Sequence, residues 1–272
     1  MASSRFGGRM RGIFIGGRFV PYYGLMIMTG ILAAAFVGRL LIKYRNLDVD
    51  KFYLFSIYVA AGGITGAKLL YVLVSFEKIE WSRLTELQYL NQFLGSGFVF
   101  YGGVIGGLGA LHLASRIHQT DIWPYLVTAI PCLPIAHGFG RIGCFLASCC
   151  WGIPYEGWGS VTYEKPCFPP AGVSLFPVQM LEAVLEFLLA GVLIVYIVKA
   201  ARKEYSLAVY LFFYCSMRFG LEYLRADTAE RGQYGWLSTS QWISLAGILI
   251  VAAWLFYDRK CRRKGEIYER GK

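Results

Sequence analysis

The chain has 272 residues, of which 56% are hydrophobic and 16% charged, and its formal net charge is +10. Soluble domains usually carry about 25% charged residues, so this composition argues against a water-soluble fold and favours apolar segments that cross a bilayer. The basic residues flank apolar segments instead of gathering on one polar face. We therefore expect membrane lipids as partners, and no nucleic acid.

Apolar runs of about 20 residues recur along the chain and predict an all-α fold, a polytopic membrane bundle of about seven transmembrane helices with a small extracytoplasmic cap. In chain order, the runs lie near Tyr23–Ile42, Phe55–Phe76, Phe98–Ser115, Ile122–Phe145, Pro177–Val198, Leu207–Leu224 and Ser238–Tyr257. The amphipathic, polar segment Glu77–Asn91 predicts a short helix that lies at the membrane interface.

The remaining segments suggest how the chain is organised. We expect residues 1–272 to form a single integral membrane domain, with a basic N-terminal arm at 1–20 that lacks the apolar core of a cleavable signal peptide. Residues 147–176 predict an extracytoplasmic loop or cap, and residues 258–272 a basic cytoplasmic tail. Lys and Arg near residues 43–51, 116 and 199–203 also favour a cytoplasmic location, which puts the N-terminus outside. The arginines of the arm argue the other way.

The sixth apolar run contains charged residues that are costly inside a membrane. In YCSMRFGLEYLRAD, residues Tyr214, Arg218, Glu222 and Arg225 are spaced so that they share one helical face. An arginine in a span costs about 2.5–3.5 kcal/mol on insertion scales, and such residues usually face the bundle interior and serve function. An Arg218–Glu222 pair that only stabilises the bundle is the alternative. Two arginines exceed what Glu222 neutralises, and this favours an anionic ligand.

Further charges lie in the fourth and fifth runs. Arg141 follows His137 within HGFGRIG, where glycines, Gly143 among them, leave room beside a guanidinium that can grip a phosphate with two hydrogen bonds. Gln179, Glu182 and Glu186 share one face of the fifth run, near its outer end, where partial hydration is expected to lower the cost of the carboxylates. Cations exceed carboxylates among Arg141, Arg218, Arg225, Glu182 and Glu222, so we expect a phosphate group rather than a metal ion or a transported cation.

Lys68 and a set of glycines add to this prediction. Lys68 in the second run either snorkels or pairs with a glutamate. The glycines at 62–66 and 102–109 are spaced for close helix packing. They would also let a lipid headgroup approach backbone N–H groups, at Gly102 and Gly103 in particular.

Four cysteines, Cys144, Cys149, Cys150 and Cys167, gather at the end of the fourth run and in the loop after it. CxxxxCC lacks the usual CxxC spacing of zinc sites, and we expect neither a bound metal ion nor another cofactor. A disulfide from Cys167 to Cys149 or Cys150, a redox-active thiol, and small buried thiols without chemistry remain open interpretations.

Over nearly its full length the chain resembles the prolipoprotein diacylglyceryl transferase family. The segments that carry the resemblance, in family order, are YYGLM (22–26), GGITGAKLLYVL (62–73), GFVFYGGVIGG (97–107), GRIGCFLASCCWG (140–152), FPVQMLE (176–182), YCSMRFGLEYLRAD (214–227) and LSTSQWIS (237–244). The resemblance implies a multi-pass enzyme of the bacterial inner membrane with seven spans. It would transfer a diacylglyceryl group from phosphatidylglycerol to the lipobox cysteine of a prolipoprotein, with glycerol phosphate as the leaving group.

The resemblance also implies roles for individual residues. Arg141 and Arg218 match essential arginines, which would neutralise charge on the leaving phosphate. Tyr23, Tyr214, Glu222 and Gly152 fall on functional or signature positions, and Glu182 matches the acidic residue that follows the His-Pro-x-Gln motif. The expected catalytic residues are Arg141, Arg218, Glu222, Tyr101 and Tyr214. The expected substrate-binding residues are Tyr23, Lys68, Gly102, Gly103, His137, Gly143, Cys144, Gly152, Gln179, Glu182 and Arg225.

The chain departs from the family pattern at several positions. Tyr101 stands where the family has a histidine before Gly-Gly, and Cys144 replaces the asparagine of Gly-Asn-Phe. Cys149 replaces an acidic residue, and Phe176 replaces the histidine of His-Pro. The base that deprotonates the attacking thiol, whose free pKa is about 8.5, is therefore open between Tyr101 and Glu222. Two alternatives remain: a divergent member with another acceptor, and a small-anion transporter, against which the absence of an inverted repeat argues.

Overall fold

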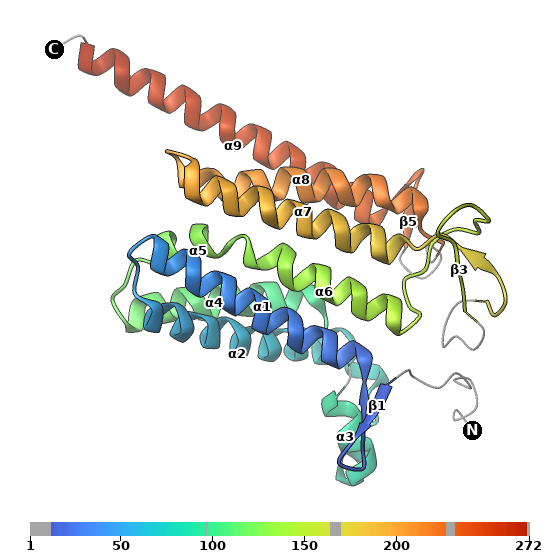
Figure 1. Cartoon of the computed structure of the whole chain (residues 1–272). Helices are drawn as coiled ribbons and strands as arrows, with labels where there is room; N and C mark the ends of the chain where they lie inside the picture. The colour runs from blue at the N-terminus through green and yellow to red at the C-terminus, as the bar shows by residue number, and fades with distance from the viewer. Residues whose placement is uncertain (1–11, 96, 164–169, 227–231, 271–272) are drawn as a thin grey trace. The chain divides into compact units, whose positions relative to one another are not determined.

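The computed structural model describes residues 12–95, 97–163, 170–226 and 232–270. The described part of the chain is dominated by helices (Figure 1). The α-helices are α1 (Tyr22–Tyr44), α2 (Val49–Val74), α3 (Leu87–Gly95), α4 (Phe100–Ile117), α5 (Trp123–Ala129), α6 (Cys132–Leu146), α7 (Val178–Lys199), α8 (Ser206–Leu221) and α9 (Thr239–Arg270). The strands form three antiparallel pairs: β1 (Gly12–Ile15) with β2 (Arg18–Pro21), β3 (Val161–Thr162) with β4 (Ser174–Leu175), and β5 (Gln233–Tyr234) with β6 (Leu237–Ser238).

The length and apolarity of these helices confirm the predicted helical membrane fold. Within the described residues, five helical segments are long and apolar enough to cross a membrane, or six if the bent pair α3–α4 counts as one span. Helix α8 has 16 residues and is therefore about 24 Å long, which is less than the ~30 Å hydrocarbon core. The 3₁₀ turn η4 (Glu222–Leu224) extends it, so the predicted run Leu207–Leu224 corresponds to α8 and this turn together.

The predicted fourth span is not one continuous helix. It divides into α5 and α6, with a turn at Ile130 and Pro131 between them. Pro131 has no backbone N–H and cannot continue the hydrogen-bond ladder of α5. The N–H of Leu133 instead donates to the Ile130 carbonyl at 3.1 Å, and α6 begins afresh at Cys132.

The chain packs as two compact units, one made of residues 42–126 and the other of residues 1–41 and 127–272. In the first unit, α2 packs along α4 through glycines. A Cβ at Gly66 would collide with the Gly102 carbonyl oxygen and lie 2.8 Å from the Gly106 Cα. These glycines therefore let the two backbones touch, as their spacing predicts.

The polar segment after α2 differs from the prediction of one interfacial helix over 77–91. It forms two short 3₁₀ helices, η1 (Phe76–Lys78) and η2 (Trp81–Thr85), followed by α3. Pairing of Arg83 with both Glu80 and Glu86, at 2.8 and 3.1 Å, fits the tight turn of η2.

In the second unit, α6 packs on α7, α7 on α8, and α8 on α9, and these helices lie roughly side by side (Figure 1). Ala34, Ile135 and Ala190 join α1, α6 and α7 in one buried cluster. A second cluster of Ile130, Leu189 and Leu193 packs against α8. The small side chains of Ala34 and Ala190 let α1, α6 and α7 approach one another, and this packing positions the polar groups described below.

The terminal segments contain more regular structure than the sequence predicts. Residues 12–21 of the expected arm form the β1–β2 hairpin, which runs directly into α1. Helix α9 continues to Arg270, so most of the predicted basic tail prolongs the last helix.

Candidate active site

The polar residues in the first half of α7 lie on its buried face. Gln179, Glu182 and Glu186 have exposed fractions of 1%, 0% and 0%, so the shared face predicted from their spacing is confirmed. The expected partial hydration of the two carboxylates is wrong. They are buried against α6, and cationic and imidazole groups take the place of water.

Helix α6 supplies those groups one turn apart, from His137 and Arg141. Arg141 Nη2 lies 2.9 Å from Glu182 Oε1, and Arg141 Nε donates to His137 Nε2 at 3.2 Å. His137 Nδ1 lies 2.7 Å from Glu186 Oε1. Because Nε2 accepts a hydrogen bond, the ring proton belongs on Nδ1 and points at Glu186. The histidine therefore links the arginine to the deeper carboxylate.

Arg225 reaches the same carboxylate from another part of the chain. Its Nη1 lies 3.7 Å from Glu182 Oε2, and the residue is 3% exposed. The predicted placement of Arg225 on one helical face with Arg218 is wrong, because the chain turns through η4 and is extended at Arg225 (φ −102°, ψ 138°). We call Arg141, His137, Glu182, Glu186 and Arg225 the carboxylate network.

Arg218 and Glu222 form a second pair on α8, at 2.9 Å between Nη2 and Oε2. Arg218 Nη2 also donates to Ser240 Oγ of α9 at 3.2 Å. Its Nη1 is buried and has no hydrogen-bond partner among the described residues. Ser240 was missed by the sequence analysis, although it lies in the LSTSQWIS segment. Tyr214, one turn before Arg218, places its ring centroid 5.7 Å from that of His137 and stacks on Tyr210.

The charges of the site balance, contrary to the predicted excess of cations. Glu186 joins the network through His137, so three arginines face three carboxylates when the histidine is neutral. The groups are nevertheless arranged unevenly. The side chains of Arg141 and Arg218 are 13% and 11% exposed, whereas those of Glu182, Glu186 and Glu222 are 0–2% exposed. Arg141 and Arg218 are thus more accessible than the carboxylates with which they pair, and His137, at 28%, is more accessible still.

Three chain segments cross next to this network, at a position that only glycine can occupy. A Cβ on Gly152 would collide with the Phe176 carbonyl oxygen and lie 3.0 Å from that of Leu224. Gly152 and Arg225 form an antiparallel β-bridge. The Ile153 N–H donates to the Leu224 carbonyl, and the Ile153 carbonyl accepts from the Phe176 N–H. We call this crossing the clasp. It places Arg225 beside Glu182 and gives the predicted Gly152 a packing role.

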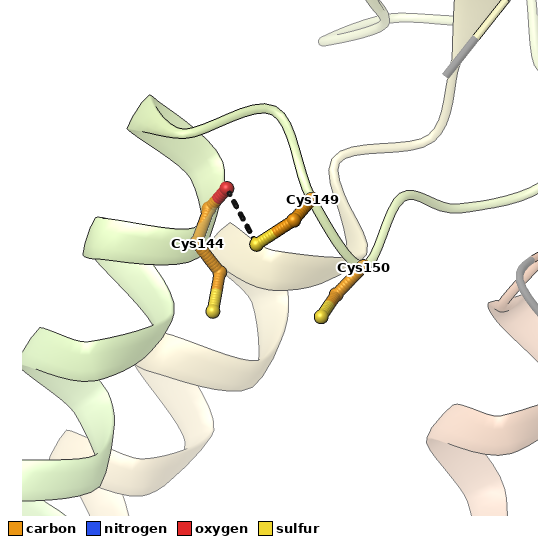
Figure 2. A group of neighbouring side chains, drawn as sticks. All are labelled: Cys144, Cys149 and Cys150. Atoms are coloured by element: carbon orange, nitrogen blue, oxygen red, sulfur yellow. Dashed lines mark hydrogen bonds between the residues drawn. The ribbon is translucent and has the colours of Figure 1, made fainter. Parts of the chain in front are cut away.

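Cys144, Cys149 and Cys150, the thiol cluster, come together where α6 ends. The helix ends in a Schellman motif: Cys149 N donates to Cys144 O at 3.0 Å and Ser148 N to Phe145 O at 3.1 Å. Ser148 takes the left-handed conformation (φ 56°), as does Cys150 (φ 59°). The chain therefore folds back on α6, and the three sulfur atoms lie within 4.8 Å of one another (Figure 2).

The environment of the thiol cluster shifts the pKa values of Cys149 and Cys150 in opposite directions. Hydrogen bonds with the Cys144 and Cys149 thiols, aided by the charges of Arg225 and Arg141, lower the pKa of Cys150. Hydrogen bonds with Cys144 and Cys150 raise the pKa of Cys149. The predicted substrate residue Gln179 fixes this segment, since its Nε2 donates to the Cys149 carbonyl at 2.8 Å. The expected disulfide to Cys167 lies outside the described residues, and the three clustered thiols are free.

The other predicted residues occupy two further places. Tyr23 of α1 lies beside Gly143, where an added Cβ would stand 3.1 Å from the tyrosine ring. Tyr101, Gly102, Gly103 and Lys68 belong to the unit of residues 42–126. There Gly102 is buried against α2, and Gly103 faces it. Lys68 Nζ donates to the Phe93 carbonyl and lies 3.9 Å from the centroid of the Phe93 ring, so an aromatic setting surrounds the predicted cation.

An apolar groove lies between α7 and α8. Its volume is about 420 Å³, and its lining includes Leu185, Leu189, Met217 and Leu221. The two helices that form this groove also carry Glu182 and Arg218. A hydrocarbon chain in the groove would therefore run along the elements that hold the charged groups.

The match to known proteins covers most of the chain. The family model described as prolipoprotein diacylglyceryl transferase matches residues 13–257. The chain belongs to this family. It is 38% identical over 228 residues to the phosphatidylglycerol–prolipoprotein diacylglyceryl transferase of Clostridium tetani, with 84% of this chain and 89% of the relative covered.

Two further relatives of the prolipoprotein diacylglyceryl transferase family extend this similarity. The chain is 33% identical to phosphatidylglycerol–prolipoprotein diacylglyceryl transferase 2 of Clostridium perfringens, with 91% and 94% covered. It is 27% identical to the transferase of Xylella fastidiosa, with 88% of both covered. Membership of this family, together with the long apolar helices, identifies a multi-pass membrane protein.

Proposed function

We propose that this protein transfers the diacylglyceryl group of phosphatidylglycerol to the lipobox cysteine of prolipoproteins and releases glycerol phosphate. The relatives carry that activity in their names and cover most of this chain. The observation that supports it most directly is that Arg141 and Arg218 remain partly accessible while the carboxylates with which they pair are buried. That arrangement suits a lipid phosphate that must gain charge as it leaves.

Arg141 and Arg218 act on the leaving phosphate. A phosphodiester carries one negative charge and a departing phosphate monoester gains a second, so guanidinium groups in a site shielded from water favour the transition state over the ground state. Arg218 Nη1 is buried and has no hydrogen-bond partner within the described chain, so its N–H groups are not committed to another residue there. Glu182 and Arg225 position Arg141, and Glu222 and Ser240 position Arg218.

The lipid tails are accommodated next to these groups. The groove between α7 and α8 has an apolar lining that suits a hydrocarbon chain. Seating one acyl chain there would hold the glycerol carbon that reacts close to the arginines. Tyr214 and His137 would line the polar side of the same approach.

We also propose an inner-membrane location with the N-terminus outside and the C-terminus in the cytoplasm. Basic residues at the ends of α1 and α7, Lys43 and Lys199, and the basic residues after Tyr257 support it. A fluorescent protein that folds only in the cytoplasm, fused to the C-terminus, should be bright. A well-expressed fusion that does not fluoresce would refute the cytoplasmic location of the C-terminus.

The transfer reaction is tested with purified full-length protein, phosphatidylglycerol vesicles and a lipobox peptide. We expect a thioether-linked diacylglyceryl peptide, detected by mass spectrometry, and rescue of a strain depleted of its own transferase. Arg141→Ala and Arg218→Ala should each lose at least about 100-fold in rate, as expected for loss of a group that stabilises the transition state. The control is Arg83→Ala, at an exposed pair that is 47% accessible. Folded wild-type protein that neither rescues nor lipidates would refute the proposal.

A further inference from the structure

The thiol cluster has the make-up of a metal site that the sequence spacing conceals. Cys144, Cys149 and Cys150 place three sulfur atoms within 4.8 Å of one another. Three sulfur ligands on a tetrahedral zinc ion, with Zn–S of about 2.3 Å, lie about 3.8 Å apart. Movements of less than about 1 Å would therefore close the cluster on an ion. The CxxxxCC spacing brings the three sulfur atoms together because the Schellman turn at Ser148 folds the last two cysteines back over the end of α6.

We propose that Cys144, Cys149 and Cys150 bind a zinc ion whose fourth position is taken by the thiol of the acceptor cysteine. This inference rests on the proposed transfer reaction. Three protein ligands with one open position are typical of catalytic rather than structural zinc. The three cysteines are partly exposed, so an acceptor can reach the ion.

The zinc ion would activate the attacking sulfur. The transfer needs a thiolate, and a free thiol is only a few per cent ionised at pH 7. Glu222, one candidate for the base that would form the thiolate, is ion-paired with Arg218. A thiol that coordinates zinc is deprotonated outright, so the ion replaces a general base.

The chemistry balances without oxidation or reduction. The acceptor S–H loses its proton to water as sulfur binds zinc. The coordinated sulfur then attacks the glycerol carbon that bears the phosphate, forming a C–S bond as the C–O bond breaks. Glycerol phosphate leaves with the bonding electron pair, and the neutral thioether, a weaker ligand than a thiolate, dissociates from zinc.

Metal content is the first test, made on full-length protein purified in detergent without chelators. We expect about one zinc ion per chain, as for a single three-cysteine site, and its loss in Cys144→Ser, Cys149→Ser and Cys150→Ser. Cys132→Ser is the matched control, because Cys132 donates to Ala34 O from the far end of α6. Wild-type protein without metal, with copper in place of zinc, or with a disulfide within the thiol cluster would overturn the proposal.

Cobalt substitution tests the site in the wild-type chain, so it does not depend on variants that fold. Stripped protein loaded with Co²⁺ should show the sulfur-to-cobalt charge-transfer bands of a tetrahedral thiolate site. A lipobox peptide should change the cobalt bands, and the same peptide with serine for cysteine should not. Equal responses to both peptides would refute the open coordination position.

The rate and its pH dependence separate this inference from the proposed function. At pH 7, removal of zinc should lower lipid transfer by at least about 30-fold, the deficit of thiolate for a free pKa of 8.5. Below about pH 8.5, the rate of the metal-free protein should rise about tenfold for each unit by which the pH increases, whereas the rate of the zinc-loaded protein should not. Fast transfer by metal-free protein, with no effect of chelators, would refute the zinc site and leave the proposed function standing. Stoichiometric zinc on the three cysteines without any transfer would refute the proposed function and leave the zinc site standing.

Discussion

Glu182 is the residue whose removal should disturb this protein most. Its two carboxylate oxygens face two guanidinium groups, Arg141 at 2.9 Å and Arg225 at 3.7 Å, and the side chain is 0% exposed. At an effective dielectric constant of 20, these attractions amount to about 6 and about 4.5 kcal/mol before desolvation is counted. Glu182→Gln keeps the shape and removes the charge, which leaves two buried cations with one uncharged acceptor.

The net loss should be smaller than the sum of these attractions, since the buried carboxylate also paid a desolvation cost. Breaking a buried ion pair by removing one partner typically destabilises by about 3–5 kcal/mol, and we expect Glu182→Gln to fall in that range. Glu222→Gln should cost less, because it isolates one guanidinium that keeps its contact with Ser240. The free energy of unfolding is measured by tryptophan fluorescence as SDS is added to mixed micelles.

The matched control for Glu182 is Glu77→Gln, because Glu77 lies exposed in η1. We expect its unfolding free energy to change by less than about 0.5 kcal/mol. A loss below about 1 kcal/mol for Glu182→Gln, the range of surface pairs, would refute the reasoning that Glu182 neutralises both arginines.

Three smaller substitutions test packing and local geometry by the same measurement. Gly66→Ala should destabilise the protein by about 1–3 kcal/mol, because the added Cβ would meet the backbone of α4. Gly109→Ala, with open space around it, should not. Equal effects would contradict the close packing of α2 on α4 through glycines. Asp48→Ala should cost about 1 kcal/mol, since Asp48 Oδ1 caps α2 by accepting from Asp50 N at 2.8 Å and Lys51 N at 3.3 Å; no loss would mean that the cap is not needed. Ser148→Gly should stabilise by up to about 1 kcal/mol by relieving a left-handed φ of 56°, and a loss would show that the serine side chain matters more than the strain.

Hydropathy and helical spacing predicted the helices and the inward face of α7, because both depend on local sequence. The side chains of Gln179, Glu182 and Glu186 share a face through the geometry of one helix alone. What spacing could not give is the pairing between helices. Arg141 and Arg225 share Glu182, and Glu186 engages His137, only because of how α6, α7 and the end of α8 are placed. The predicted charge excess failed for this reason.

Breaks in regular structure were the other source of error. Arg225 falls on the predicted face only if α8 continues past Leu221, and the chain instead turns through η4 and extends. Pro131 was visible in the sequence, but proline is common enough in membrane helices that it did not predict a break. The thiol cluster was obscured similarly, since the CxxxxCC pattern does not show that Ser148 adopts a left-handed turn.

The clasp has a consequence for how this family can vary. Backbone hydrogen bonds at Ile153, Tyr155 and Phe176 close the segment between residues 155 and 174 at its base. Insertions or deletions beyond that closure alter the length of the loop without moving Arg225 or Glu182. The loop can therefore vary in length while Gly152 keeps Arg225 beside Glu182.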